Sequence, residues 1–505
     1  MFMTHRKIVN VMIYLLILTM SVHFFAFIYN AIIAVYYPFE LFDAEGIVWQ
    51  QAMLIPGPRM YGDINKYPFI VFHYPPLYHM LARAISLTGC TPLLAGRALS
   101  LVAAITSATA ISILTYRLAA LEIGRLASLL GSVVSGLAFF CFYPIVVTST
   151  FMRVDMLAIA LSFLGLLCFT ASSIRSWQLF VGMTFFVLAV YTKQTSIAAP
   201  LATIAVVGLV APWKALKILV FGLLLGFIPL AVLMWMTKGG FLVHLILYNI
   251  NRYDVDLVWE QIVGQAPHII FVMSAFFGLL IWWRRFLPSI KVARMATWRD
   301  VLSRDGQARA MAMITLYLGL STLMLAGLGK SGATVAYFDE WAGILCILVG
   351  FLVAAVAAPG SASGLLSGIG IRPAFTLLLP VLLIVQVLKV PVKGPTDFSD
   401  EIQRRASYQL VDRIARAEKP VLSSDMVMLM IAGKQVPWEP AIFEELASVG
   451  RWDESQIVRK IVAHDFAFIV TTKDPHFTPA VTAAVDAAYP RIEEIARHRI
   501  HLPVD

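Results

Sequence analysis

The sequence predicts an α-helical polytopic membrane protein of about eleven transmembrane helices, followed by a small α/β domain. Three observations support this fold class. The 505 residues are 59% hydrophobic, with a mean hydropathy of +0.80. Only 14% of the residues are charged, whereas soluble domains carry about 25%. Apolar runs of about 20 residues, the length that crosses a bilayer core, recur up to residue 390, and a polar segment follows.

The apolar runs define the expected spans. They cover residues 9–36, 94–116, 126–147, 155–173, 177–192, 197–212, 216–236, 268–283, 310–329, 340–358 and 373–390. The first run is much longer than the apolar core of a signal peptide, so we expect it to stay as an anchor. The four cysteines have no metal-like spacing and are expected to be packing residues.

The distribution of charge predicts the orientation. Up to Pro395 the chain has 26 Lys and Arg against 13 Asp and Glu, and beyond it 13 against 17. If the N-terminus is inside, the inner segments carry fifteen basic residues against Glu122, Asp300 and Asp305, while the outer segments are nearly balanced. The positive-inside rule therefore predicts a cytoplasmic N-terminus and an extracytoplasmic C-terminal domain. It also accounts for the net charge of +9 without nucleic acid as a partner.

The chain divides into an expected transmembrane domain, 1–395, and an extracytoplasmic α/β domain, 396–505. In the second part, helical patterns at 399–418, 442–448, 454–464 and 478–497 alternate with short strands at 421–424 and 466–471. No G-x-G-x-x-G motif occurs there, so the sequence gives no reason to expect a nucleotide.

The first outer segment, 37–93, is too long for a simple connection. Residues 44–55 and 77–88 have helical spacing with one apolar face, which is typical of helices that lie in a membrane interface. Asp43 precedes the first of these helices, and Glu45 lies in its first turn. An Asp in this place is more often an N-cap, and Glu45 could simply favour the helix dipole. The length of the loop and its concentration of acids and bases nevertheless favour a functional site.

A series of short motifs runs through the chain in topological order. They are Asp43-Ala44-Glu45 in the first outer loop, Tyr74-Pro75-Pro76-Leu77, Arg97-Ala-Leu-Ser at the second span, Arg153-Val-Asp155 at the fourth, and Lys193-Gln194-Thr195 between the fifth and sixth. Together they resemble the GT-C glycosyltransferases, specifically the family of protein O-mannosyltransferases and the 4-amino-arabinose lipid A transferase. The resemblance covers most of the chain, including the eleven spans and the outer C-terminal domain.

The resemblance implies transfer of a sugar from a polyprenyl-phosphate-linked donor to an extracytoplasmic glycan, lipid or protein, in the inner membrane of a bacterial cell. It implies an inverting displacement with Asp43 as the general base on the acceptor hydroxyl. Glu45 would orient the acceptor, or share a divalent cation with Asp43, although no third metal ligand is evident. Besides donor and acceptor, the expected partners are membrane lipids.

The leaving lipid phosphate needs a cation to stabilise its charge. The candidates on the outer side are Arg59, Lys66, Arg153, Lys193, Arg252 and Lys330. The lipid A transferase type has a Lys before Pro-Pro-Leu, where this chain has Tyr74 preceded by His73. This departure passes the role to another cation, or to His73 and Tyr74 as hydrogen-bond donors, and argues against aminoarabinose as the sugar.

Other candidate residues have structural alternatives. Tyr337 and Glu340 resemble an outer-loop motif of bacterial relatives and are expected to contact donor or acceptor, although acids there could also cap a helix. Arg153 and Asp155 could form an interfacial salt bridge, and Lys193 could snorkel to the membrane surface.

Two other function classes stay open at this point. A transporter or lipid flippase would also have many spans and a few charges at membrane depth. No convincing internal repeat is visible, however, and the charges gather at the outer interface instead of the midplane. The third class is a non-catalytic assembly or receptor protein whose C-terminal domain binds a partner.

Overall fold

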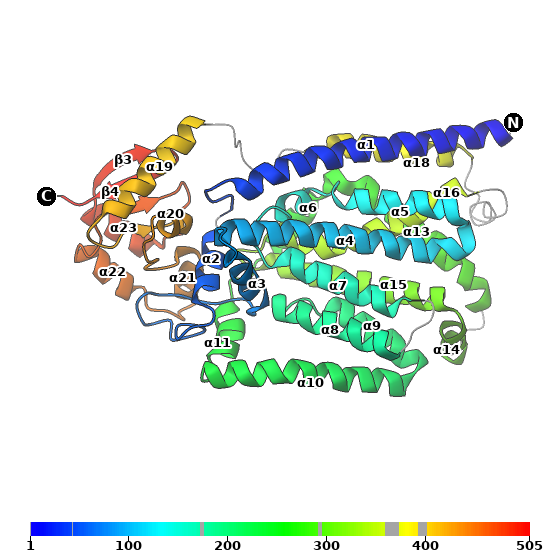
Figure 1. Cartoon of the computed structure of the whole chain (residues 1–505), viewed down its shortest axis with the longest axis horizontal. Helices are drawn as coiled ribbons and strands as arrows, with labels where there is room; N and C mark the ends of the chain where they lie inside the picture. The colour runs from blue at the N-terminus through cyan, green and yellow to red at the C-terminus, as the bar shows by residue number, and fades with distance from the viewer. Residues whose placement is uncertain are drawn as a thin grey trace.

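The computed structural model describes residues 2–42, 44–171, 176–290, 295–358, 373–391 and 401–504. Asp43, the expected general base, lies outside these residues, and so does the expected domain boundary at 395. The described chain forms a long helical bundle with a small lobe at one end, and the N-terminus lies at the other end (Figure 1).

The bundle is built from apolar helices. They are α1 (Phe2–Tyr36), α4 (Pro92–Ile123), α5 (Arg125–Phe139), α6 (Tyr143–Thr148), α7 (Asp155–Phe169), α8 (Ser176–Thr192), α9 (Ala198–Val210), α10 (Pro212–Met236), α13 (Ile269–Ile290), α15 (Gly306–Met324), α16 (Phe338–Ala357) and α18 (Pro373–Lys389). Within the described residues, six helical segments, in α1, α4, α10, α13, α15 and α16, are long and apolar enough to cross a membrane. The chain is thus a multi-pass membrane protein, while the exact count of eleven spans stays a prediction.

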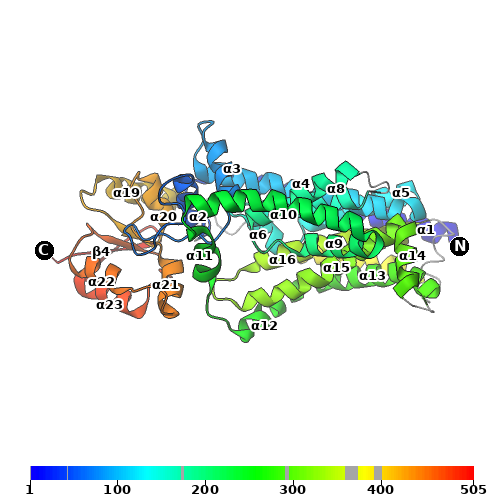
Figure 2. The same ribbon diagram turned by 90° about the horizontal axis from the view of Figure 1, so that it is seen from below.

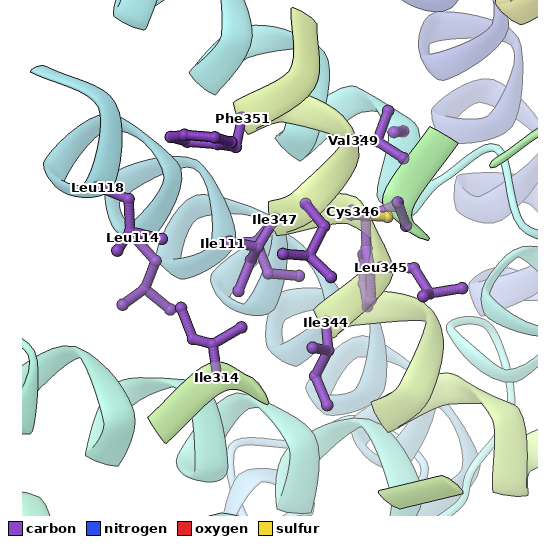
Figure 3. Packing of buried hydrophobic residues seen from close by; sticks show 14 of the residues in the cluster. Ile111, Leu114, Leu118, Ile314, Ile344, Leu345, Cys346, Ile347, Val349 and Phe351 are labelled. Atoms are coloured by element: carbon purple, nitrogen blue, oxygen red, sulfur yellow. The ribbon is translucent and has the colours of Figure 1, made fainter. Parts of the chain in front are cut away.

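Helix α16 is the centre of the bundle and packs against α4, α5, α13 and α15. Figure 3 shows Ile344 and Ile347 of α16 beside Ile111 of α4, with Ile314 of α15 nearby. Close approach to α5 depends on glycine, because a Cβ added at Gly131 would lie 2.3 Å from the Gly350 carbonyl oxygen. Small residues commonly allow membrane helices to pack this closely.

The expected single span at 126–147 is wrong in one respect, because the chain forms two helices there. Helix α5 ends at Phe139, and α6 begins at Tyr143. Pro144 lies in the first turn of α6. A proline cannot donate to the preceding turn and disfavours helical geometry in the residue before it, so the helix restarts at this point.

The first outer segment contains α2 (Ala44–Leu54) and α3 (Leu77–Ser86). Helix α3 exposes Met80 and Leu81, with Leu87 just beyond its end, as expected of an interfacial helix. Helix α2 differs from the expectation, because Val48 and Gln50, on opposite faces, are both buried. It packs between α3, α4 and α20 of the lobe. Its apolar face is therefore covered by protein instead of lying in the membrane surface.

The lobe combines five helices with one sheet. The elements are α19 (Glu401–Arg416), β1 (Leu422–Ser423), α20 (Met426–Ile431), α21 (Pro440–Ser448), α22 (Ser455–Val462), β2 (Ile469–Thr471), α23 (Pro479–Ala488), β3 (Arg491–Ile495) and β4 (His498–Leu502). The strand order is β1-β2-β4-β3, with β1 and β2 parallel and the other pairs antiparallel. The expected helix at 478–497 is wrong in its second half. Pro490 interrupts it, and residues 491–502 pair as a hairpin.

The lobe shares its hydrophobic core with the first outer segment. Phe39, Ile47 and Phe69 pack with Trp438 and Phe443 of the lobe. The backbone amide of Phe69 also donates to the carbonyl of Pro437 at 2.9 Å. The lobe end of the bundle is therefore built jointly by the two parts of the chain.

Shorter helices complete the described structure. They are α11 (Gly240–Ile246), η1 (Leu247–Asn249), α12 (Val255–Gly264), η2 (Ala266–His268), α14 (Met295–Arg304), η3 (Leu325–Gly329) and η4 (Val335–Tyr337). Figure 2 shows α11 and α12 towards the lobe end and α14 at the opposite end of the bundle.

Candidate active site

Five of the residues singled out from the sequence meet at the lobe end of the bundle, and we call them the Asp155 cluster. They are Tyr74, Arg153, Asp155, Lys193 and Tyr337. Asp155 begins α7, Lys193 follows α8 directly, and Tyr337 ends η4 just before α16. The cluster thus collects residues from four separate parts of the sequence.

Asp155 lies between two cations. Its carboxylate accepts hydrogen bonds from Arg153 Nε at 3.0 Å and from Lys193 Nζ at 2.6 Å. The Asp155 side chain is 1% exposed, whereas Arg153 is 11% and Lys193 is 15% exposed. The salt bridge expected between Arg153 and Asp155 is confirmed. Lys193 does not extend to the surface, because it forms an ion pair with the same carboxylate.

Aromatic and hydroxyl groups surround the two cations. The guanidinium of Arg153 lies 5.0 Å from the centroid of the Phe42 ring, and Lys193 Nζ lies 5.1 Å from that of Tyr337. Arg153 also donates to Thr334 Oγ1 at 3.3 Å and hydrogen-bonds Tyr74. Burial opposes both positive charges, but Asp155 outweighs it and raises the pKa of Lys193 and of Arg153. Both side chains are therefore cations at neutral pH.

His73 and Lys330 lie beside this cluster. The His73 ring stacks on Tyr74 with centroids 5.5 Å apart, and its carbonyl accepts from Gln194 Nε2 at 2.8 Å. Burial, together with nearby Lys330, lowers the pKa of His73 to about 3, so the ring is neutral at physiological pH. Lys330 donates to the carbonyl of Asn249 at 2.8 Å, and burial lowers its pKa.

A small polar pocket of about 30 Å³ lies behind Lys193. Its lining includes Asp155, Lys193, Thr195, Ser196, Ser321, Tyr337 and Glu340. Glu340 is hydrogen-bonded by the Tyr317 hydroxyl. The predicted contact residues Tyr337 and Glu340 therefore border the same pocket as the ion pair. Asp339, which directly precedes Glu340 in α16, is fully buried and close enough to Asp155 and Lys193 to interact electrostatically.

Glu45 lies apart in a second buried ion pair, with Arg97 of α4. Arg97 Nε donates to Glu45 Oε1 at 2.7 Å and Arg97 Nη2 to Oε2 at 2.6 Å, and both side chains are fully buried. The backbone amides of Leu41 and Met152 also donate to the carboxylate, both at 2.8 Å. Arg97 donates further to the carbonyls of Ala34, Tyr37 and Phe39.

This arrangement bears on the metal suggested for Asp43 and Glu45. Both oxygens of Glu45 are already engaged by a guanidinium and two amides, a donor set that suits an anion and leaves no lone pair directed at a cation. Within the described ranges, no group of three His, Cys, Asp or Glu residues could hold a metal ion. Glu45 therefore does not fit a metal site.

Three other predicted cations lie away from the Asp155 cluster. Arg59 donates to the carbonyls of Lys66 and Pro68 and so closes the loop 59–68. Lys66 is exposed in that loop. Arg252 pairs with Glu445 of the lobe at 3.2 Å. The side chains of Arg59 and Arg252 thus hold a loop and the lobe in place, and within the described ranges no hydrogen bond or ion pair joins any of the three to Asp155.

An apolar groove of about 780 Å³ leads along the bundle towards the cluster. It lies between α8, α9 and α10, and Phe241 of α11 and Pro75 line its outer part. Leu201, Leu223 and Phe227 of its walls are more than half exposed, so the groove opens on the lipid-facing side. Its lining includes Gln194, the neighbour of Lys193. The groove thus reaches the residues that follow Lys193 and Tyr74 of the cluster in sequence.

Some residues of the site were not identified from the sequence. Arg97 and Gln194 were noticed only as parts of short motifs, and the roles of Tyr317, Thr334 and Asp339 were missed. The available sequence signal for Arg97 is an Arg at the start of an apolar span, because a charge at that depth requires a partner. Tyr317 lies within an apolar run that carries no comparable signal.

Bundle and lobe together have the same fold as solved structures of ArnT, so the predicted architecture of a helical membrane bundle with a small C-terminal α/β domain is confirmed. The chain is similar to the crystal structure of ArnT from Cupriavidus metallidurans in the apo state, with a TM-score of 0.58 and 13% identity over 94% of this chain and 96% of that one. The same protein bound to undecaprenyl phosphate has a TM-score of 0.57 and 14% identity, covering 94% and 97%.

A third similar structure is the oligosaccharyltransferase AglB from Archaeoglobus fulgidus, with a TM-score of 0.48 and 11% identity over 92% of this chain and 72% of that one. No protein-family model matches the sequence, and no curated protein sequence matches it either.

Proposed function

We propose that this protein is a glycosyltransferase that takes a sugar from a polyprenyl-phosphate donor and transfers it to an acceptor on the extracytoplasmic side of a bacterial inner membrane. The observation that carries the proposal is the apolar groove, which reaches Gln194, the residue after Lys193, and Pro75, the residue after Tyr74. An isoprenoid chain suits the groove, and a phosphate suits the cations. The ArnT structure with undecaprenyl phosphate supports a ligand of this class.

In this proposal Lys193 and Arg153 stabilise the phosphate as the bond from its oxygen to the sugar breaks. Asp155 orients both cations, and the rings of Phe42 and Tyr337 cover them. Tyr74 takes the place of the lysine of the lipid A transferase type and can donate its hydroxyl. Lys330 and neutral His73 add a further cation and donor near the same point.

Asp43 is proposed as the general base that takes the proton of the acceptor hydroxyl while the acceptor oxygen bonds to the anomeric carbon with inversion. Support comes from its sequence neighbour, because the Phe42 ring lies beneath the guanidinium of Arg153 and stacks on Phe151 with centroids 5.2 Å apart. The acceptor is a glycan, a lipid or a protein. Glu45 serves this site by holding the segment around Asp43 to α4, not by contacting substrate.

The decisive experiment compares wild type with Asp43→Asn, using labelled undecaprenyl-phosphate sugars and measuring released undecaprenyl phosphate. The variant should still bind donor lipid and lose transfer by roughly 100-fold or more. Full transfer by Asp43→Asn would overturn the role of this residue. No release from any donor, together with movement of the lipid across proteoliposome membranes, would support the transporter instead.

The variant Gly226→Leu tests separately whether the groove binds the donor lipid. A Cβ at Gly226 meets only Val187 Cγ1, at 3.9 Å, so a larger side chain fits and occupies the groove. We expect weaker binding of undecaprenyl phosphate and a higher KM for the donor. Gly264→Leu is the matched control, because no atom lies within 4 Å of its Cβ position and Gly264 does not line the groove. Equal donor KM values in the two variants would contradict the assignment of the groove.

A further inference from the structure

A second large cavity, of about 910 Å³, lies at the end of the bundle opposite the lobe. Its walls come from the end of α9, the start of α10, and from α13, α14 and α15. Figures 1 and 2 both place α14 at this end. The cavity shares no lining residue with the groove that leads to the Asp155 cluster. It therefore requires an explanation of its own.

Glycines and a fixed tryptophan shape this cavity. No heavy atom lies within 4 Å of a Cβ added at Gly319, and a Cβ at Gly208 would meet only Ala215, at 3.8 Å. The indole of Trp283 donates to Thr315 Oγ1 at 3.0 Å, and its ring lies 5.6 Å from that of Trp298 on α14. The cavity is thus left open along α15 and bounded by an ordered aromatic pair, a residue type that favours membrane interfaces.

Basic side chains gather around this end of the bundle. Arg299 of α14 lines the cavity and is exposed. Four more exposed basic residues lie close in sequence to residues that line the cavity. They are Lys214, Lys217, Arg284 and Arg304. The acidic residues there are Asp300, which is exposed, and Asp305, whose carboxylate caps α15 by accepting from the amides of Gln307 and Ala308. The net charge of these exposed residues is therefore positive.

We propose that this cavity binds an anionic phospholipid from the leaflet remote from the Asp155 cluster. Its acyl chains would lie among Leu209, Leu302 and Leu316, and its phosphate would pair with Arg299. Charge complementarity selects the occupant, because basic residues near a membrane surface attract anionic lipids, and a guanidinium binds phosphate in two-point contact. The volume falls within the range of about 300–1,000 Å³ typical of small-molecule sites. The inference does not depend on the proposed transferase activity.

The test uses the full chain in detergent, incubated with dioleoylphosphatidylglycerol or dioleoylphosphatidylcholine, with retained lipid measured by native mass spectrometry. Wild type should retain the anionic lipid at least tenfold better. Gly319→Leu, which fills the cavity, and Arg299→Ala, which removes the exposed cation, should each lower its retention several-fold. The controls Gly264→Leu and Arg405→Ala, the latter on the lobe, should bind as wild type does.

Equal retention of the two lipids by wild type would overturn the proposal. Unchanged retention of phosphatidylglycerol in Gly319→Leu would also overturn it, because the lipid would then lie elsewhere. Arg299 is exposed, so Arg299→Ala removes a charge without disturbing the packed interior and keeps the test valid should Gly319→Leu fold poorly.

Discussion

Two buried ion-pair networks lie at the lobe end of this protein, and they differ in what surrounds them. The Glu45–Arg97 pair is fully enclosed, and backbone groups engage both partners on every side. The Asp155 cluster borders a polar pocket, an apolar groove reaches its sequence neighbours Pro75 and Gln194, and its two cations keep some exposure. Similar residue types are therefore enclosed by backbone groups in one network and border a pocket in the other, and the proposed function assigns ligand binding only to the second.

The largest effect is expected when the enclosed Glu45–Arg97 ion pair is broken. Arg97→Met would leave the Glu45 carboxylate buried without its counter-charge, at a cost of about 3–5 kcal/mol. We expect a strong fall in the melting temperature and in the yield of folded protein, measured in detergent. The double variant Arg97→Met with Glu45→Leu should recover part of the stability, since neither charge is then left alone. A stable Arg97→Met protein that lost only activity would contradict the structural role of this pair.

The next largest effect is expected from a substitution in the Asp155 cluster. Lys193→Ala should lower transfer by about 10²–10³-fold, because one cation at the leaving phosphate is lost. Asp155 keeps Arg153 as its partner, so the melting temperature should change little. Donor turnover and thermal unfolding measured on the same preparation check both statements. A loss of stability as large as that of Arg97→Met would mean that the two networks do not differ as proposed.

A smaller effect is expected for Arg153→Lys, which keeps the charge but loses the planar group over Phe42 and the proposed two-point contact with phosphate. We expect transfer to fall by about tenfold, with a higher KM for the donor. Arg252→Lys is the matched control, since Arg252 lies on the loop that contacts the lobe. An equal response in both variants would contradict a specific role for Arg153.

The smallest effect is a pH dependence of stability through His73. Its folded pKa of about 3 lies below the ordinary value of 6.5, so the unfolded chain binds the proton first as pH falls. Stability should therefore decrease between pH 6.5 and 3, by at most about 1.4 kcal/mol per pH unit. Melting temperatures at pH 7 and 5 should differ less in His73→Gln than in wild type. An identical decrease in both proteins would contradict the burial of a neutral ring.

Much of the fold followed from hydropathy. The apolar runs predicted the helices of the bundle because each run must satisfy its own backbone groups in lipid, which a helix does locally. The break between α5 and α6 and the hairpin at 491–502 were not predicted. Pro144 and Pro490 can be read from the sequence. Whether a proline ends, bends or restarts a helix depends on the neighbouring residues that hydrogen-bond the backbone groups left without a partner.

The candidate site was predicted less completely. Asp155, Arg153, Lys193, Tyr74 and Tyr337 were all named from motifs, and they meet in one cluster. The same reasoning from charge and membrane side also predicts Arg59, Lys66 and Arg252, yet Arg59 closes a loop, Arg252 pairs with the lobe and Lys66 is exposed. Charge and topology identify the membrane face on which a residue lies, but they do not determine which residues on that face are neighbours.

Hydropathy and charge in the sequence predict a membrane bundle with a small α/β lobe, and they predict which ionisable residues gather at one end of it. The physical reason is that burial in lipid constrains every span separately. The pairing of Glu45 with Arg97, the two cations around Asp155 and the groove that reaches Gln194 appear only in the folded chain. These outcomes depend on contacts between distant segments, in which one carboxylate is fully satisfied by its surroundings and the other is left facing an open pocket.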